Sequence, residues 1–433
     1  MPDGLDQPPS TANGSTPTPG PVTAPQRLRS TRHRRPPLVA FINDAETERV
    51  LAQELAGLLS GHVDVRRGSI RAAIAAMQTE VTPALLIVDV SGDSQPLSAL
   101  AELANVIEPD VSVLVIGEVD SADFYREVTR SLGAQEYLPK PLTRDKVARH
   151  IAALLPGHAL VSAVLGGVLV IITGVRGGVG ATTLAVNLAG YFGISLHRHT
   201  VLLDTDLHFG DAAFQLNLKP GPGLRTALDT PERIDTLLAE RAGQAAATRL
   251  DLLAGEESLD TRLNVAPGSA ATLLRSLRRR YNFIVADARP RPGPINDDLL
   301  EQAHQRVLVM LPTLASVRAA LRIMAVSPKP NQAKRPVIVL NRLGVPGGLT
   351  RREVERALDM KVDVTISDQP RQVAAAATMG ELAVSNKGAI RTGVMELAKH
   401  VAAAGMLDSL ATTCALKAKP GTRRRRGLFG WRS

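Results

Sequence analysis

A glycine-rich segment, VRGGVGATT at residues 175–183, has the composition of a loop that binds phosphate. It directly follows an apolar run and directly precedes a helical pattern, LAVNLAGYFG. Glycines let successive backbone N–H groups point inward at a phosphate chain, and the following helix adds its N-terminal partial positive charge. The hydroxyl of Thr182 would lie where such loops bind Mg²⁺. A glycine turn without a ligand is the alternative, but the context favours a nucleotide site formed by Gly177, Gly178, Val179, Gly180, Ala181, Thr182 and Thr183.

The loop lacks the lysine that stands before the hydroxyl residue in ordinary GK[ST] loops, because Ala181 occupies that position. This replacement removes the cation that contacts the β- and γ-phosphates. Arg176 is the only cation within the loop itself. We therefore expect weakened phosphate binding and slow or absent hydrolysis.

Three carboxylates follow apolar runs that have the character of strands. Asp204 and Asp206 end the segment TVLLDTD, and Asp287 lies near the end of NFIVADA. Ligands of open α/β sheets bind outside the carboxyl ends of strands, so these side chains can face the loop. One carboxylate could orient water while Asp204 or Asp287 helps Thr182 to hold Mg²⁺. The alternative for each is a helix cap or a turn residue.

A second group of polar residues lies earlier in the chain. Asp44 follows the first apolar run, Asp89 ends another, and Lys140 precedes a proline after a short strand. Asp44 and Asp89 could bind Mg²⁺ together, Asp89 could accept a phosphoryl group, and Lys140 could neutralise it. This pattern resembles a response-regulator receiver, although Asn43 replaces one acid and Gly117 replaces the usual Thr or Ser. A degenerate receiver that serves only for docking or dimerisation is the alternative.

Two series of apolar runs and helical patterns position these residues. The first has runs at 38–42, 85–90 and 111–117, a short strand near 136–138, and helical patterns at 45–59, 97–107, 121–132 and from 143. The second has runs at 168–173, 200–206, 249–255, 282–288, 306–312, 336–341 and 362–367, with a last helix at about 391–410. Strands that alternate with helices predict parallel sheets covered on both faces. The expected fold class is α/β, with two doubly wound parallel-sheet domains: a flavodoxin-like, receiver-type domain and then a P-loop domain.

Composition sets the boundaries of these domains. We expect a disordered basic tail at 1–37, the first domain at 38–155, a linker at 156–167, the second domain at 168–410 and a basic tail at 411–433. The 433 residues include 51 Lys plus Arg against 42 Asp plus Glu, and the excess positive charge lies in the two tails, which leaves the body near neutral. The single cysteine, Cys414, excludes an internal disulfide framework and a Cys-rich zinc site. The uncharged stretch at 159–175 is shorter than the roughly 20 residues that a spanning helix needs, and with no signal peptide we expect a cytoplasmic protein.

The C-terminal tail joins a run of arginines to apolar and aromatic residues. Basic side chains attract anionic headgroups, and Phe and Trp suit the membrane interface. A solvated tail without a partner and a nucleic-acid contact are the alternatives, nucleic acid being the weaker. The residues expected to contact an anionic membrane are Arg423, Arg424, Arg425, Arg426, Leu428, Phe429 and Trp431.

Four motifs, VRGGVGATT, VLLDTDLHFGD, FIVADARP and VIVLNR, resemble in order and spacing the ParA/MinD group of deviant Walker A ATPases. Within that group they are most similar to the CpaE/TadZ branch, pilus-assembly proteins with a receiver-like domain ahead of the ATPase domain. The resemblance covers roughly residues 38–410. It implies that Arg176 is the cation that reaches across a nucleotide-sandwich dimer, that Asp206 activates water, that Asp287 is the Walker B acid and that Asn341 reads adenine. The absence of lysine at residue 181 is similar to departures within this branch.

The resemblance also implies a function. We expect a homodimer that binds ATP and Mg²⁺, hydrolyses ATP slowly if at all, and works with pilus or secretion-system assembly proteins at the inner face of the cell membrane or the cell pole. A MinD-like division-site regulator would share every motif. A phosphorelay regulator would require modification of Asp89. A ParA-like DNA-segregation protein would need a basic body, which the near-neutral charge argues against.

Overall fold

The computed structural model describes residues 35–58, 64–154, 167–233, 242–263, 265–325 and 335–402. The predicted C-terminal tail, including its seven expected membrane-contact residues, lies outside these ranges, as do nearly all of the predicted N-terminal tail and linker. Within the described ranges, no helix has both the length and the apolar character needed to cross a lipid bilayer.

The first sheet has five strands in the order β2-β1-β3-β4-β5, and every neighbouring pair is parallel. This is the flavodoxin-like order, which confirms the predicted fold class of this part. Its strands are β1 (Leu38–Ile42), β2 (Asp64–Arg67), β3 (Leu85–Asp89), β4 (Ser112–Gly117) and β5 (Glu136–Pro139). The sequence pattern missed β2 and the helix after it, because the edge strand DVRR is partly exposed and carries no apolar run.

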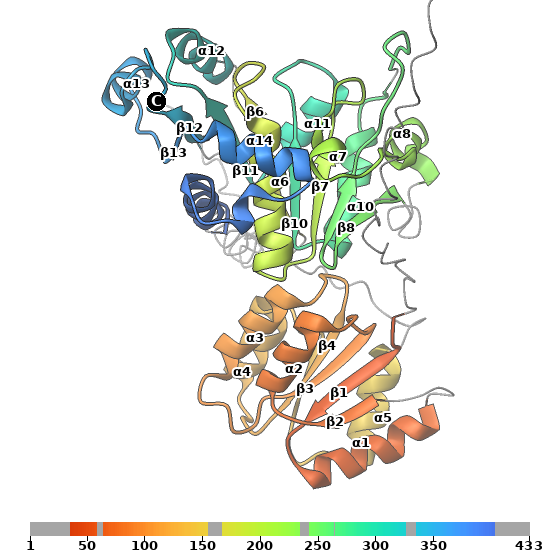
Figure 1. The fold of residues 1–433 in the computed structure, drawn as a ribbon. Helices are drawn as coiled ribbons and strands as arrows, with labels where there is room; N and C mark the ends of the chain where they lie inside the picture. Colours follow the sequence, from red (N-terminus) through yellow and green to blue (C-terminus); the bar gives the residue numbers. More distant parts are fainter. Residues whose placement is uncertain are drawn as a thin grey trace, which may run out of the picture. The chain divides into compact units, whose positions relative to one another are not determined.

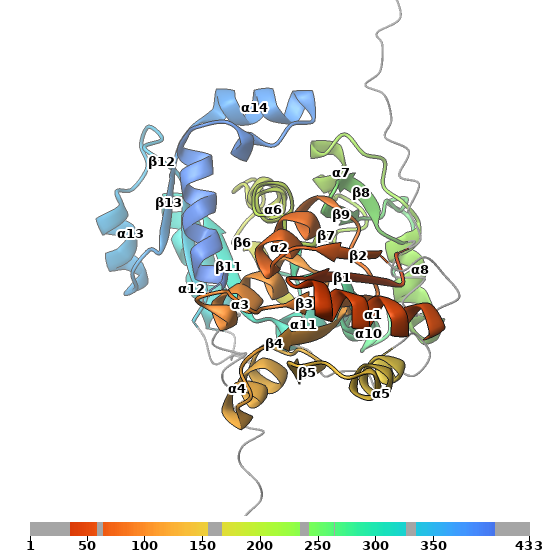
Figure 2. The same cartoon turned by 90° about the horizontal axis from the view of Figure 1, so that it is seen from below.

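Helices cover both faces of this sheet, so β1 and β3 are buried along their whole length. The helices are α1 (Ala45–Leu58), α2 (Ile70–Thr79), α3 (Pro96–Val106), α4 (Ala122–Arg126) with a π-helical turn at Glu127–Ser131, and α5 (Arg144–Leu154). Alternate residues of β1 enter two cores: Leu38, Ala40 and Ile42 meet α1 and α5, while Val39 and Phe41 meet α2 and α3. The two groups of helices lie on opposite sides of the strands (Figure 1, Figure 2).

The second sheet has eight strands in the order β13-β12-β11-β6-β10-β7-β9-β8. They are β6 (Val168–Gly174), β7 (Thr200–Asp204), β8 (Gln244–Ala247), β9 (Leu250–Leu253), β10 (Phe283–Asp287), β11 (Gln305–Met310), β12 (Val337–Leu343) and β13 (Val364–Ser367). All pairs are parallel except that of β8 and β9, which is antiparallel. The predicted α/β, doubly wound fold of this part is confirmed. Its sheet is mixed only at this edge, where the strand QAAA gives no alternating pattern.

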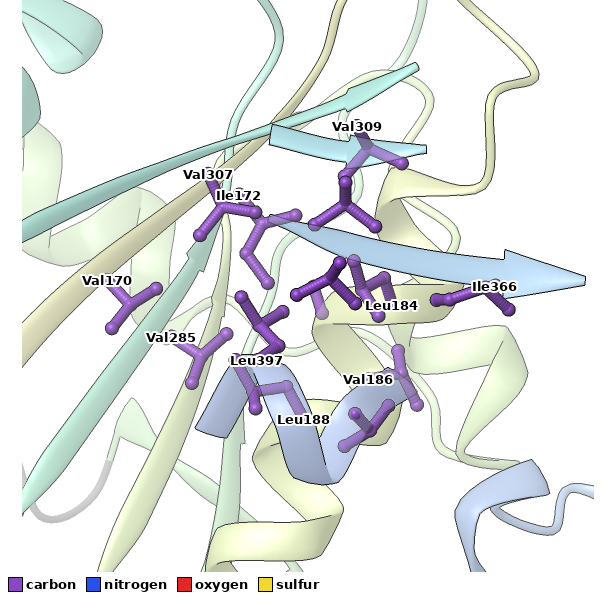
Figure 3. Close-up of a cluster of buried hydrophobic side chains, with 14 of the residues drawn as sticks. Val170, Ile172, Leu184, Val186, Leu188, Val285, Val307, Val309, Ile366 and Leu397 are labelled. Carbon is purple, nitrogen blue, oxygen red and sulfur yellow. The ribbon is translucent and has the colours of Figure 1, made fainter. Parts of the chain in front are cut away.

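Helices also cover both faces of the second sheet. They are α6 (Ala181–Gly190) with a π-helical turn at Tyr191–Ser195, α7 (Ala212–Gln215), α8 (Gly223–Asp229), α10 (Ser269–Arg280), α11 (Pro294–Gln302), α12 (Leu314–Met324), α13 (Arg351–Leu358), α14 (Pro370–Met379), short 3₁₀ turns at Pro231–Arg233 and Ala383–Ser385, and a helix at 389–402. One core lies against α8, α10 and α11, and the other lies against α6, α12 and the helix at 389–402. Figure 3 shows Leu397 of that last helix beside Leu188 of α6.

The central strand β6 is where the winding of this sheet changes side. From β6 the chain passes to β7 and β9, returns to β10 beside β6, and then crosses to β11 on the other side of β6. Ligands of open α/β sheets bind outside the carboxyl ends of strands at such a switch point. The loop after β6 lies there.

Candidate nucleotide site

The loop after β6 has the backbone that its glycines predict. Gly178 and Gly180 have φ angles of 75° and 88°, in the left-handed region that glycine adopts without strain. The carbonyl of Gly180 accepts a hydrogen bond from the Leu184 amide at 3.0 Å, and α6 begins at Ala181. A Cβ added at Gly177 or Gly178 would meet no heavy atom within 4 Å, so the rim of the loop is open.

The backbone N–H groups of this loop are available to a ligand. Throughout the described ranges, no group accepts a hydrogen bond from the amides of residues 177–182. Helix N-termini leave such donors unpaired and carry partial positive charge, which suits a phosphate chain. The residues present therefore fit the phosphates of a nucleotide, while the side chain of Ala181 adds no cation.

Thr182 and Asp287 meet beside the loop. Asp287 ends β10, which pairs with both β6 and β7, and it lies opposite Asp204 in the strand register. Burial raises the pKa of Asp287 to about 7; a hydrogen bond from the Thr182 hydroxyl opposes this rise, and the charges of Asp204 and Asp206 add to it. The predicted magnesium side chains therefore lie together. No described cluster of three or more His, Cys, Asp or Glu side chains has metal-binding geometry, but Mg²⁺ held largely by phosphates and water needs only one or two protein ligands.

Asp204 shapes the loop that follows β7. It is 2% exposed, and its two oxygens accept hydrogen bonds from the amides of Asp206 and Ala212, each at 3.1 Å. Burial raises its pKa, although the two amides oppose the rise. A Cβ at Gly210 would lie 2.5 Å from Asp204 Oδ2, so only glycine fits there. Asp204 thus holds the loop in place, and its part in metal binding stays a prediction.

Asp206 faces the neighbouring loop. Its Oδ1 accepts hydrogen bonds from the amides of His208 and Phe209, at 3.3 and 3.1 Å. Its Oδ2 forms an ion pair with Nε of Arg289. Sequence reasoning missed Arg289, although it lies only two residues after Asp287, because no local pattern indicates a pairing between two loops. The role of Asp206 in activating water remains a prediction.

Asn341 reaches the loop from β12. Its Nδ2 donates to the carbonyl of Val179 at 2.8 Å, and a Cβ at Gly180 would lie 2.6 Å from that nitrogen. A cavity of about 300 Å³ begins here, and its lining includes Thr183, Leu184, Asn341, Asp368 and Ile390. An apolar wall with a few polar groups suits a nucleobase, and adenine reading by Asn341 remains a prediction.

Arg176 stands at the start of the loop and is exposed. No acid among the described residues forms an ion pair with it. Its guanidinium is therefore available to a ligand or to a second chain, as its predicted role requires.

The polar residues of the first sheet also come together. Nζ of Lys140 lies 2.6 Å from Asp44 Oδ2 and 2.7 Å from Asp89 Oδ2, at the edge of a cavity of about 530 Å³. Asp89 further accepts hydrogen bonds from the amides of Asn43 and Ser91. Although burial raises the pKa of Asp44, hydrogen bonds from Lys140 and Thr47 outweigh it and lower the pKa to about 2. The arrangement is compatible with Mg²⁺ or a phosphoryl group, and phosphorylation of Asp89 stays a prediction.

A tyrosine fills the space beside Gly117. A Cβ at Gly117 would lie 2.8 Å from the Tyr137 hydroxyl, which donates to the carbonyl of Val119, also at 2.8 Å. Tyr137 is 2% exposed, so it has no room to move aside without repacking. A Thr or Ser at 117 would therefore clash, so Tyr137 occupies the space that the side chain of a receiver's usual Thr or Ser would need.

We compared this chain with known proteins. No family model matches the chain. The septum site-determining protein MinD of Bacillus subtilis (strain 168) is 24% identical over 184 residues, which span 41% of this chain and 65% of that protein, less than two thirds of its length.

Two solved structures that are similar to this chain are those of a ParA family ATPase and of a pilus assembly protein. The structure of a ParA family ATPase from Chlorobium tepidum TLS has a TM-score of 0.50 and 20% identity, covering 55% of this chain and 99% of its own. The structure of a pilus assembly protein CpaE from Caulobacter crescentus CB15 is 32% identical, covers 27% of this chain and 97% of its own, and has a TM-score of 0.25. The part of the chain that carries the eight-stranded sheet has the fold of the ParA family ATPase.

Proposed function

We propose that this protein is an ATP-binding localisation and assembly factor for a Flp/Tad-type pilus or secretion apparatus, and that it acts as a nucleotide-dependent homodimer. The observation that carries the nucleotide part is the open loop at 177–182, whose amides have no acceptor among the described groups and whose Thr182 meets Asp287. The order of the four sequence motifs supports the CpaE/TadZ assignment.

Different residues of the site would bind different parts of Mg²⁺-ATP. The loop amides would hold the phosphates of ATP, Thr182 and Asp287 would hold Mg²⁺, and Asn341 would contact the base beside the cavity. Bound Mg²⁺ supplies positive charge that offsets the phosphates. Asp206 would orient water, but with Ala181 in place of lysine less charge stabilises the reaction, so hydrolysis is slow.

Dimerisation links the nucleotide to position in the cell. An exposed Arg176 can reach the nucleotide held by a second copy, so ATP would favour the dimer. A dimer offers twice as many basic tails, and avidity makes weak binding of each tail to an anionic membrane effective. The receiver-like part serves as a docking module in this scheme, since Tyr137 blocks the usual switch position.

A MinD-like role in placing the division site is the second candidate, favoured by the 24% identity to the Bacillus subtilis protein. Cells that lack the chain and are complemented with the wild type or with Asp287→Ala distinguish the two. We expect loss of surface pili and normally placed septa in the deletion strain and in the Asp287→Ala strain, with full rescue by the wild type. Misplaced septa with normal pili would contradict the pilus proposal and select the division role.

A further inference from the structure

Arg289 lies against the loop that carries Asp206 and holds it by three contacts. Its Nε pairs with Asp206 Oδ2, one of its terminal nitrogens donates to the carbonyl of Phe209 at 3.4 Å, and its guanidinium carbon lies 5.3 Å from the centre of the Phe209 ring. An ion pair combined with a cation–π contact is more directional than either alone. The segment 206–209, which Asp204 and Asp206 hold from within the loop, is therefore also held by one side chain from the next loop.

The base of Arg289 is itself fixed. Asn296 of α11 donates to the carbonyls of Arg289 and Arg291, which ties this loop to a helix. Across the neighbouring strand end, the amide and hydroxyl of Thr205 donate to the carbonyl of Asp287, at 3.1 and 2.8 Å. The backbones after β7 and β10 are thus joined, and the ion pair lies above this junction.

Arg289 shields the carboxylate of Asp206, which the proposed hydrolysis of ATP needs. Oδ1 of Asp206 already accepts two amide hydrogens, and Oδ2 is shielded from solvent beside Arg289. A carboxylate orients an attacking water only by accepting a hydrogen bond from it. While the ion pair is closed, Asp206 has no oxygen that is both free and accessible.

The ion pair can nevertheless open. The Arg289 side chain is 41% exposed, against 16% for Asp206, and it lines a cavity of about 470 Å³ beside Pro292 and Asn296. The guanidinium can therefore swing into solvent or towards a phosphate without displacing the core. Partly exposed ion pairs of this kind contribute little stability, so a bound anion can compete with Asp206 for Arg289.

We propose that Arg289 is a positioning residue that keeps Asp206 in a resting arrangement and so restrains the hydrolysis of ATP. The proposal rests on the ATP binding proposed above. The slow turnover expected of this chain then has two causes: the missing cation at residue 181, and the carboxylate of Asp206 that Arg289 shields. Arg289 acts through Asp206 and needs no contact with the reacting atoms.

Hydrogen exchange of the full chain without nucleotide tests the restraint directly. We expect faster exchange in the segment 205–212 for Arg289→Ala than for the wild type, with no change for Arg291→Ala, a control that removes a nearby exposed cation. In a variant that already carries Asp206→Asn, adding Arg289→Ala should change the exchange rate of this segment little. Equal effects in both backgrounds, or unchanged exchange in Arg289→Ala, would overturn the proposal.

ATP turnover and ATP affinity of the same variants provide a second test. Arg289→Ala should raise the turnover number for ATP roughly twofold to fivefold, which is the scale of one partly exposed ion pair, while the dissociation constant for ATP stays within about twofold. Arg289→Lys should retain part of the restraint. A loss of ATP affinity and turnover in Arg289→Ala would make Arg289 a phosphate ligand and refute the restraint. If the wild type binds no ATP, the proposed function is wrong. The hydrogen-exchange experiment still decides whether Arg289 holds Asp206.

Discussion

Replacing Asp287 with alanine should weaken Mg²⁺-dependent ATP binding roughly 30- to 150-fold, while binding without Mg²⁺ changes little. The reason is the position of this carboxylate, which ends β10 and meets the hydroxyl of Thr182 at the start of α6. Losing a charged polar contact of this kind costs about 2–3 kcal/mol. Calorimetric titration with ATP, with and without Mg²⁺, measures the effect.

A matched control separates this loss from a general effect on the fold. Asp297→Ala removes an exposed acid from α11 and should bind Mg²⁺ and ATP like the wild type. The pKa of Asp287 in the fold is raised to about 7, so folding favours the protonated carboxyl, and its contribution to stability is lost as the pH rises from about 4 towards 7. At pH 8 the Asp287→Ala variant should therefore unfold at a temperature no lower than the wild type. Equal Mg²⁺-dependent affinity in Asp287→Ala and the wild type would contradict the site.

The same raised pKa gives this binding a pH dependence. A carboxylate binds Mg²⁺ only after it loses its proton, so the wild-type affinity should fall as the pH drops below about 7. ATP itself also gains a proton in this range, but that change affects the wild type and the Asp287→Ala variant equally. The difference in Mg²⁺-dependent ATP affinity between the wild type and Asp287→Ala should therefore be smaller at pH 6 than at pH 8.

Restoring a cation should have the opposite effect: Ala181→Lys is expected to tighten ATP binding roughly tenfold to a hundredfold. Ala181 is the first residue of α6 and lies only partly buried beside the open loop. An ammonium group there can reach the phosphates that the loop amides hold, and a charge-assisted hydrogen bond contributes about 1.5–3 kcal/mol. The expected gain appears as a lower dissociation constant at fixed salt.

Ser195→Lys provides the control for this gain, because it adds the same charge at the exposed far end of the π-helical turn that follows α6. It should leave the affinity unchanged at moderate salt, since exposed charges farther apart than a Debye length are screened. If both lysines tighten binding equally, the gain comes from net charge and not from the loop. If Ala181→Lys weakens binding while the wild type binds, the phosphates do not lie along this loop.

The strands and the glycine loop were predictable because their signals are local. The run before the loop is apolar and uncharged because β6 lies at the centre of the sheet and is covered on both faces, and the left-handed φ angles at Gly178 and Gly180 require glycine. Asp287 could be placed from the same logic, since it follows an apolar run that had to be a neighbouring strand. In each case a few adjacent residues carry the whole signal.

The features that could not be predicted from the sequence depend on contacts between segments that are distant along the chain. The edge strands β2 and β8 have no apolar alternation, because one of their sides has no strand to pair with and their side chains are partly exposed. The ion pair of Arg289 with Asp206 joins the loops after β10 and β7, and Tyr137 reaches Gly117 from β5. No spacing along the chain indicates these contacts, which exist only after the sheets have formed.

Sedimentation velocity of the full chain, with and without Mg²⁺ and ATP, measures whether nucleotide bound in the open loop favours a dimer. We expect a monomer without nucleotide, a dimer with Mg²⁺ and a slowly hydrolysed ATP analogue, and a monomer in both conditions for the double variant Thr182→Ala, Asp287→Ala. A wild type whose sedimentation does not respond to nucleotide, or a double variant that dimerises like the wild type, would contradict this expectation.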